Sequence, residues 1–184
     1  LIPGLQRGLY EMVICGIEMT DEHAEGIDFS NPYYITSERI VVRRNGPQLK
    51  NLADLNGHAI GTIKDTQAER ILTENAKVQL RTYDEETDAF MDLANGRTDA
   101  ILIDGPIAKY YGDTNPALQV VGEPIGRVEY GIAFAKGQNV ALRTKVNAAL
   151  ATMQHDGTLH RVLLRGALWT PELAAFTHHP STLN

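Results

Sequence analysis

Cysteine, long apolar runs and basic clusters are all scarce in this sequence, and each scarcity excludes a class of protein. One of the 184 residues is a cysteine, Cys15, so the chain can form neither an internal disulfide nor a cysteine-rich metal site. No apolar run approaches the roughly 18 residues of a membrane-spanning helix. Aspartate and glutamate outnumber lysine and arginine by 23 to 17, and the net charge of -6 disfavours nucleic acid as a partner.

The remaining composition is that of an ordinary globular protein, with 43% apolar and 22% charged residues. Its length suits one domain or two small lobes. The sequence contains no phosphate-binding glycine loop and no nucleophile elbow. The histidine pair His178-His179 could bind a metal, but we expect a solvated tail there and predict no metal site and no cofactor. Because the chain starts at Leu1 rather than Met, we expect that its natural start has been removed.

Strand and helix patterns alternate along the chain, which favours an α/β fold with mostly parallel sheets. We expect strands over residues 10–17, 39–43, 59–63, 78–82, 100–103, 118–121 and 130–135. We expect helices over 49–57, from Asp65 or Thr66 onward, over 86–95, 107–111 and 140–153, and a Thr20-capped turn. The strands 39–43 and 130–135 bracket a complete small α/β unit. The pattern therefore predicts two lobes, with residues 1–40 and 130–184 in lobe 1 and residues 41–129 in lobe 2.

Asp104 is the first candidate site residue, because it follows the apolar run Ala100-Ile101-Leu102-Ile103. Ligands of open α/β sheets bind outside the carboxyl ends of strands, where an acid can hold an amino group. The competing interpretation is that Asp104 only caps the helix that begins near Pro106. These two interpretations have equal weight on position alone.

Two further positions have a ligand-binding and a structural interpretation. Thr66 stands where a helix begins, and free N–H groups at a helix N-terminus can bind an anion, although ordinary capping explains it as well. Tyr33 and Tyr34 offer aromatic faces with polar tips, as ligand clefts do, but hinge or core packing explains them equally.

Six ordered motifs resemble those of the type 2 periplasmic solute-binding proteins of the amino-acid family, the extracytoplasmic receptors of ABC importers. The chain reads LIPGLQRGLYEMVICGIEMT, IDFSNPYY, LADLNGHAIGT, LANGRTDAILID, VEYGIAFAKG and GTLHRVLLRGALW. The resemblance extends over nearly the whole chain. It implies a two-lobed fold that closes around a small polar amino-acid-like or cationic ligand by a hinge motion, a membrane permease as partner, a periplasmic or extracytoplasmic location, and no enzymatic activity.

The same matching implies a set of ligand-binding residues. Asp104 matches the acid that holds the ligand's amino group, and Thr66 with Gln67 matches the helix N-terminus that receives its carboxylate. The matching also places Gly16, Glu18, His23, Tyr33 and Tyr34 at the cleft. Alternatives are an enzyme resembling cyclohexadienyl dehydratases, with Glu18 and His23 as acid/base pair, a sensory or permease-fused domain, and a relic that has lost binding.

The sequence departs from the family pattern in two ways. The family has several dozen further residues before the match to Leu1, so we expect a first lobe that is incomplete at its N-terminus and able to pair as a homodimer. Glu18 stands where the family has Ser or Thr, and His23 where it has the Arg that grips the ligand's carboxylate. This change predicts a cationic or weakly acidic ligand rather than a plain α-amino acid or, with about equal weight, a loss of binding.

Overall fold

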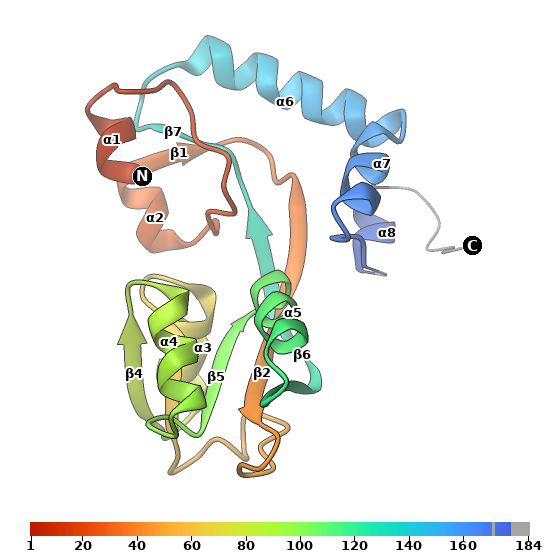
Figure 1. The fold of residues 1–184 in the computed structure, drawn as a ribbon. Coiled ribbons are helices and arrows are strands. Elements are labelled where there is room, and N and C mark those ends of the chain that lie inside the picture. Colours follow the sequence, from red (N-terminus) through yellow and green to blue (C-terminus); the bar gives the residue numbers. More distant parts are fainter. Residues whose placement is uncertain (171, 178–184) are drawn as a thin grey trace. The chain divides into compact units, whose positions relative to one another are not determined.

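The computed structural model describes residues 1–170 and 172–177 and divides into two compact units. Unit 1 comprises Leu1–Thr36 and Glu129–Asn184, and unit 2 comprises Ser37–Val128. The chain passes from unit 1 to unit 2 within β2 (Tyr34–Arg43) and returns within β6 (Leu118–Tyr130) (Figure 1). The expected α/β fold class is confirmed.

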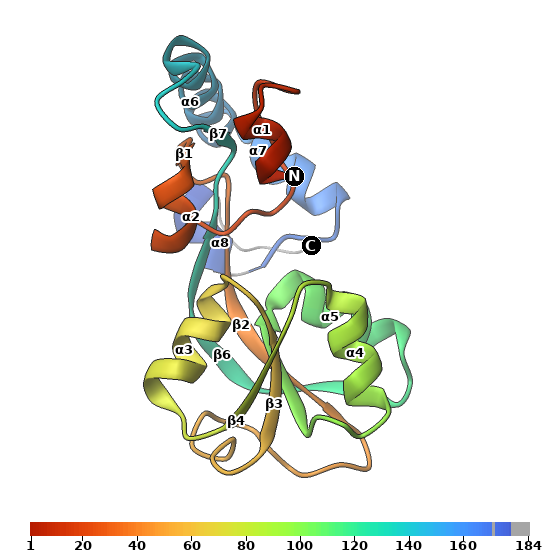
Figure 2. The ribbon, with the colours of Figure 1, turned by 90° about the vertical axis from the view of Figure 1, so that its left-hand side faces the viewer.

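Unit 2 is built on a five-stranded sheet with the strand order β4-β3-β5-β2-β6. Strand β3 runs parallel to both β4 and β5, whereas β2 is antiparallel to β5. Helix α3 lies on one face of this sheet, and α4 and α5 lie on the other (Figure 2). The bounds are Ala59–Ile63 for β3, Gln67–Asn75 for α3, Gln79–Tyr83 for β4, Glu86–Ala94 for α4, Ala100–Asp104 for β5 and Gly105–Thr114 for α5.

Alternation along the central strands gives unit 2 two apolar layers. In β5, Ala100 and Leu102 pack toward α3, while Ile101 and Ile103 pack toward α4 and α5. All four side chains are buried, as expected for a strand covered by helices on both faces. The carboxyl ends of β3 and β5 therefore emerge together from a packed core.

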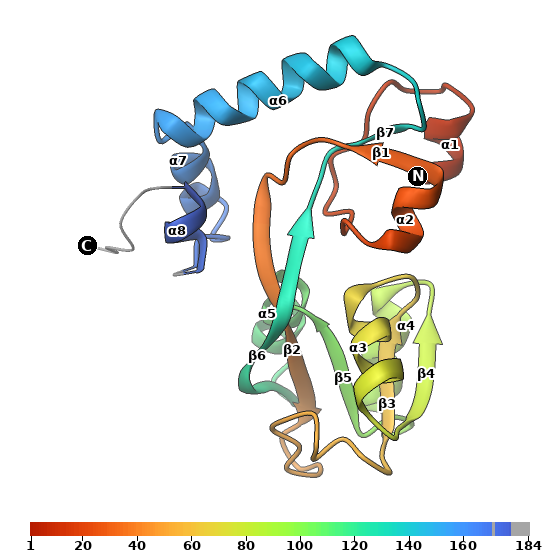
Figure 3. The ribbon, with the colours of Figure 1, turned by 180° about the vertical axis from the view of Figure 1, so that it is seen from behind.

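Unit 1 has a small antiparallel sheet of β1 and β7, and the two faces of β7 are covered by different helices (Figure 3). Ala133 and Ala135 pack with Leu5 of α1, whereas Phe134 packs with Leu150 of α6. The bounds are Ile2–Gln6 for α1, Asp21–Gly26 for α2, Ile27–Phe29 for β1, Ala133–Ala135 for β7, Val140–His155 for α6, Thr158–Arg165 for α7 and Glu172–Thr177 for α8.

Two expected elements are wrong, and the single strand expected over 130–135 is divided, because β6 ends at Tyr130 and β7 begins at Ala133. Residues 10–17 form no strand, because their pairing is limited to one isolated bridge, Val13 with Ala133, and Gly16 has a left-handed φ of 81°. Residues 49–57 form turns instead of a helix. The side chains of Asn51 and Asp54 bond to backbone N–H groups there and compete with helical bonding.

No helix in the described part of the chain has the length and apolar character needed to cross a membrane.

Candidate functional site

The first group of candidate residues lies at one edge of the unit 2 sheet. Asp104 is the last residue of β5, and Thr66 follows the end of β3 by three residues. Because β3 and β5 are parallel neighbours, with Ile60 opposite Ala100, their carboxyl ends share this edge. The structure thus brings Asp104, Thr66 and Gln67 to the edge at which α/β sheets bind ligands.

Asp104 occupies the N-cap position of α5, but its side chain makes no capping hydrogen bond to the described first turn of that helix. The residue is 8% exposed. Burial of a carboxylate is costly unless other groups compensate its charge. The hydrogen bond that a simple capping role implies is not formed, and the ligand-binding role of Asp104 stays a prediction.

Thr66 does cap α3, as the sequence predicted. Its hydroxyl donates to the carbonyl oxygen of Ile63 at 2.7 Å and accepts from the N–H of Glu69 at 3.3 Å. The carboxylate of Glu69 in turn accepts from the N–H of Asp65 at 2.7 Å, where the chain takes a left-handed φ of 61°. These bonds hold the entry into α3 in one conformation and orient Gln67, its first residue. The anion-binding role of Thr66 and Gln67 stays a prediction.

Gly16 and Tyr33 are brought together in unit 1. The N–H of Gly16 donates to the Tyr33 hydroxyl at 2.9 Å, and the ring of Tyr33 lies 6.4 Å from that of Tyr130. Burial raises the pKa of Tyr33, and the hydrogen bond from Gly16 offsets part of that rise. Tyr33 is therefore a neutral hydrogen-bonding group at physiological pH.

Glu18 and His23 are linked through the backbone. His23 Nδ1 lies 2.9 Å from the carbonyl oxygen of Glu18 and 3.1 Å from the hydroxyl of Thr20, which caps α2. Because a carbonyl oxygen only accepts, Nδ1 carries a proton and Nε2 is the nitrogen left for other partners. Glu18 is 8% exposed and forms an isolated bridge with Tyr130.

Tyr34 makes packing contacts within unit 1. Its hydroxyl donates to the carbonyl oxygen of Leu168 at 2.8 Å, and its ring stacks on Tyr130 with centroids 5.5 Å apart. These contacts match the structural interpretation of this tyrosine. Its role in ligand binding has no further support from the contacts described.

Two buried polar residues near Asp104 were missed in the sequence. Glu38 is paired with Asp104 across β2 and β5 and is fully buried, and Thr62 of β3 is also fully buried. Alternation along β2 places Glu38 on the same face as Ile40 and Val42, where a carboxylate is unexpected. A glutamate among the apolar residues of this strand face was the feature of the sequence that could have identified Glu38.

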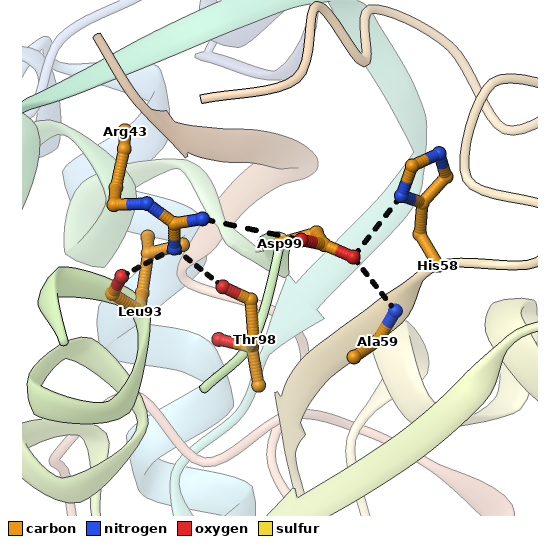
Figure 4. Close-up of polar contacts among 6 residues, drawn as sticks. All are labelled: Arg43, His58, Ala59, Leu93, Thr98 and Asp99. Atoms are coloured by element: carbon orange, nitrogen blue, oxygen red, sulfur yellow. Dashed lines mark hydrogen bonds and ion pairs between the residues drawn. The ribbon is translucent and has the colours of Figure 1, made fainter. Parts of the chain in front are cut away.

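A polar network at the opposite edge of the sheet has a structural role (Figure 4). Asp99 accepts from His58 Nδ1 at 3.0 Å and from the N–H of Ala59 at 3.2 Å, and it lies 3.9 Å from Arg43. Arg43 also donates to the carbonyl oxygens of Leu93 and Thr98 and so closes the end of α4. The polar groups of this network thus bind one another.

Among the residues that the structure describes, no group of three or more histidine, cysteine, aspartate or glutamate side chains could hold a metal ion. The His178-His179 pair lies outside the described residues.

Comparison with known proteins places these features in a family. Residues 1–165 match the family described as bacterial extracellular solute-binding proteins, family 3. The chain is 34% identical over 167 residues to the ABC transporter arginine-binding protein 1 of Escherichia coli, covering 88% of this chain and 68% of that protein. It is 37% identical over 162 residues to the L-cystine-binding protein TcyJ of the same organism, covering 86% of this chain and 60% of that protein.

A solved structure supports the same assignment. An ancestral arginine-binding protein bound to glutamine is 35% identical, with a TM-score of 0.80 and coverage of 89% of this chain and 74% of that one. These relatives are named as binding proteins and not as enzymes. The names of these relatives support a binding protein rather than an enzyme, and the chain belongs to the bacterial extracellular solute-binding proteins of family 3.

Proposed function

We propose that the protein is an extracytoplasmic receptor that binds a small amino-acid-like or cationic ligand and delivers it to an ABC permease. The observation that carries the proposal is the buried Asp104 at the carboxyl edge of the unit 2 sheet, in a chain of this family. Its side chain does not cap α5, and a carboxylate at this edge suits an amino group. Thr66 and Gln67, at the start of α3, are proposed to receive a carboxylate of the ligand.

Unit 1 contributes a second set of proposed contacts. Gly16 and Tyr33 hold the loop that carries Glu18, and His23 is fixed by that loop through Nδ1. His23 offers a single nitrogen in place of the guanidinium fork that the family pattern implies, so its hold on a carboxylate is weaker. We propose that this loop admits a cation more readily than a second carboxylate.

The proposed mechanism is closure about β2 and β6, the two segments through which the chain passes between the units. Ligand drives closure only if it binds the closed form more tightly than the open one. A permease that recognises the closed form would then receive the ligand-loaded receptor.

We also propose a periplasmic location for the protein. A homodimer through unit 1 is a further proposal, because the apolar side chains of Leu9, Met12 and Ile14 are exposed there. Light scattering, which measures the mass of the particle in solution, checks the homodimer.

Calorimetric titration with L-arginine, L-glutamine, L-cystine and putrescine tests the receptor. We expect at least one of them to bind, and Asp104→Asn to weaken that binding by about tenfold or more, because a charge-assisted hydrogen bond to the ligand is lost. Asp113→Asn is the matched control, since Asp113 is exposed and pairs with Lys109 on the surface of α5. Unchanged affinity in Asp104→Asn would contradict the assigned role of Asp104, and absence of all binding would favour the relic.

A further inference from the structure

Residues 11–15 of unit 1, here called the edge segment, lie along the edge of β7 that β1 leaves open. Val13 and Ala133 exchange both backbone hydrogen bonds, each with an N–O distance of 2.9 Å. The carbonyl oxygen of Glu11 accepts from the side chain of Asn139, just beyond β7, at 3.3 Å. Glu11 and Val13 therefore turn their backbone groups toward the β7 side.

Met12 and Ile14 turn their backbone groups the other way. Successive residues of a paired strand present their N–H and C=O groups to alternate edges, so those of Met12 and Ile14 point away from β7. In the part of the chain that the structure describes, none of these groups makes a hydrogen bond. Unpaired backbone groups along an edge are a template for another strand.

The side chains of the edge segment are also suited to a partner. Met12 is 42% exposed and Ile14 is 58% exposed, and residues two apart in a strand share one face. Val13, on the opposite face, is buried in the core of unit 1. Proteins often protect an edge from pairing with lysine or proline, and residues 9–16 contain neither. The edge segment thus combines open backbone groups with exposed apolar side chains.

The ends of the edge segment restrict how a second strand can pair with it. Gly16 takes a left-handed φ of 81°, and its N–H donates to the Tyr33 hydroxyl at 2.9 Å, so the edge ends before it. Tyr10 lies in a bend on the other side. The outward backbone groups are therefore those of Met12 and Ile14.

We propose that the edge segment pairs antiparallel with the edge segment of a second copy of this chain, about a two-fold axis at Val13. The inference rests on the homodimer proposed above and supplies its contact. A two-fold contact requires a self-complementary surface, and this segment is one. Each Met12 exchanges both backbone hydrogen bonds with Ile14 of the second copy, which also places their apolar side chains directly opposite each other.

The charges permit this register. Glu11 lies opposite Cys15 of the second copy, so the pairing places no like charges opposite each other. It also joins the two small sheets of β1 and β7 into one continuous sheet through the paired edge segments.

Sedimentation velocity on the whole chain, over about a hundredfold range of concentration, tests the dimer by mass action. We expect a shift from monomer to dimer. Met12→Lys charges the edge, and Ile14→Pro removes an N–H that the pairing needs, so each weakens dimerisation by about tenfold or more. Val162→Lys is the matched control, because Val162 is a 52% exposed apolar residue of unit 1 on α7.

A cross-link tests the register. Opposed residues of a non-hydrogen-bonded pair have Cα atoms about 4.5 Å apart, within the range of a disulfide. We expect Val13→Cys, combined with Cys15→Ser, to form a disulfide-linked dimer under mild oxidation, and Val162→Cys with Cys15→Ser to stay largely monomeric.

A monomer at every concentration, or a dimer that neither Met12→Lys nor Ile14→Pro weakens, would overturn the inference. A dimer without the cross-link at Val13 would overturn the register. Calorimetric titration of ligands is a separate measurement, so either result leaves the receptor function standing, and absence of ligand binding leaves the dimer standing.

Discussion

Asp28 is the residue whose contacts lead most directly to a pH dependence. Its carboxylate accepts from the N–H of Gly137 at 3.0 Å and pairs with Arg143 at 2.9 Å and Lys136 at 3.4 Å. The hydrogen bond from Gly137, with smaller contributions from Lys136 and Arg143, lowers the pKa of Asp28 against the opposing effect of burial. These contacts tie β1 to the turn after β7 and to the start of α6.

A lowered pKa in the folded state means that the native protein binds the proton more weakly than the unfolded chain. The contribution of Asp28 is therefore present above the unfolded pKa of about 3.9 and is lost as the pH falls through the lower, folded value. We expect Asp28→Asn to lower the free energy of unfolding at pH 6 by about 1–3 kcal/mol and to change it less at pH 3. Urea unfolding at the two pH values measures both, with Asp113→Asn as control. An equal loss at pH 6 and pH 3 would show that the charge of Asp28 is not responsible.

Individual residues differed in how far the sequence could predict them. The caps Thr20 and Thr66 were predicted correctly, because a cap depends on neighbours three positions away. Glu38 was missed, because its importance depends on its register with Asp104, which is 66 positions away in the chain and is set by the sheet. The contact of His23 with a backbone carbonyl was also beyond a pattern argument, since the sequence does not show ring orientation.

Among whole elements, the network of Asp99 gives the clearest prediction. Asp99 joins the beginning of β3 to the end of β2 through Ala59, His58 and Arg43 (Figure 4). Removing it leaves the N–H of Ala59 and the donors of Arg43 with fewer partners in a partly buried place. We expect Asp99→Ala to lower the free energy of unfolding by about 1–3 kcal/mol without changing ligand preference, because the network lies at the other edge of the sheet from Asp104.

Chemical denaturation followed by circular dichroism measures this loss. Asp113→Ala is the comparison, because exposed ion pairs within a helix contribute about 0.3–0.5 kcal/mol. A loss in Asp99→Ala no larger than that in Asp113→Ala would show that the network has little structural importance.

The elements that the sequence predicted best are those that need only local information. The helices of unit 2 and the buried strand at 100–103 follow from periodicity and end signals. Residues 10–17 have the composition of a strand, but a strand also needs a continuous partner, and a single isolated bridge, at Val13, forms there. In residues 49–57 the side chains of Asn51 and Asp54 accept hydrogen bonds from backbone N–H groups and so compete with helical hydrogen bonding. The spacing of apolar residues does not reveal this competition.

At the scale of the whole molecule, the order of six motifs predicted the family, which the comparisons confirm. The candidate site was predictable only in part. Asp104 and Thr66 follow from the rule that ligands bind at the carboxyl ends of strands, whereas Glu38 and Thr62 emerge only when β2, β3 and β5 are placed side by side.

Unit 2 has the features of a segment that folds without the rest of the chain. It is one continuous stretch, Ser37–Val128, and both faces of its sheet carry their own buried core. The strands at its two ends, β2 and β6, are neighbours in the sheet, and the unit boundaries fall inside them, so the unit keeps residues 37–43 of β2 and 118–128 of β6 beside the whole of β3, β4 and β5. We expect a fragment of residues 37–128 to unfold cooperatively, with an enthalpy on the order of 60 kcal/mol at its midpoint, the value typical of a domain of its length.

Calorimetry on the isolated fragment checks this expectation. A broad transition without a heat-absorption peak would show that residues outside 37–128 are required to hold the sheet together. The variant Leu102→Asp is the matched negative control, because it places a charge in the fully buried core under α3 and should abolish the transition. If the fragment folds and Leu102→Asp does not, the pairing of β2 with β5 that positions Asp104 is held by unit 2 alone, without any contribution from Glu18 or His23.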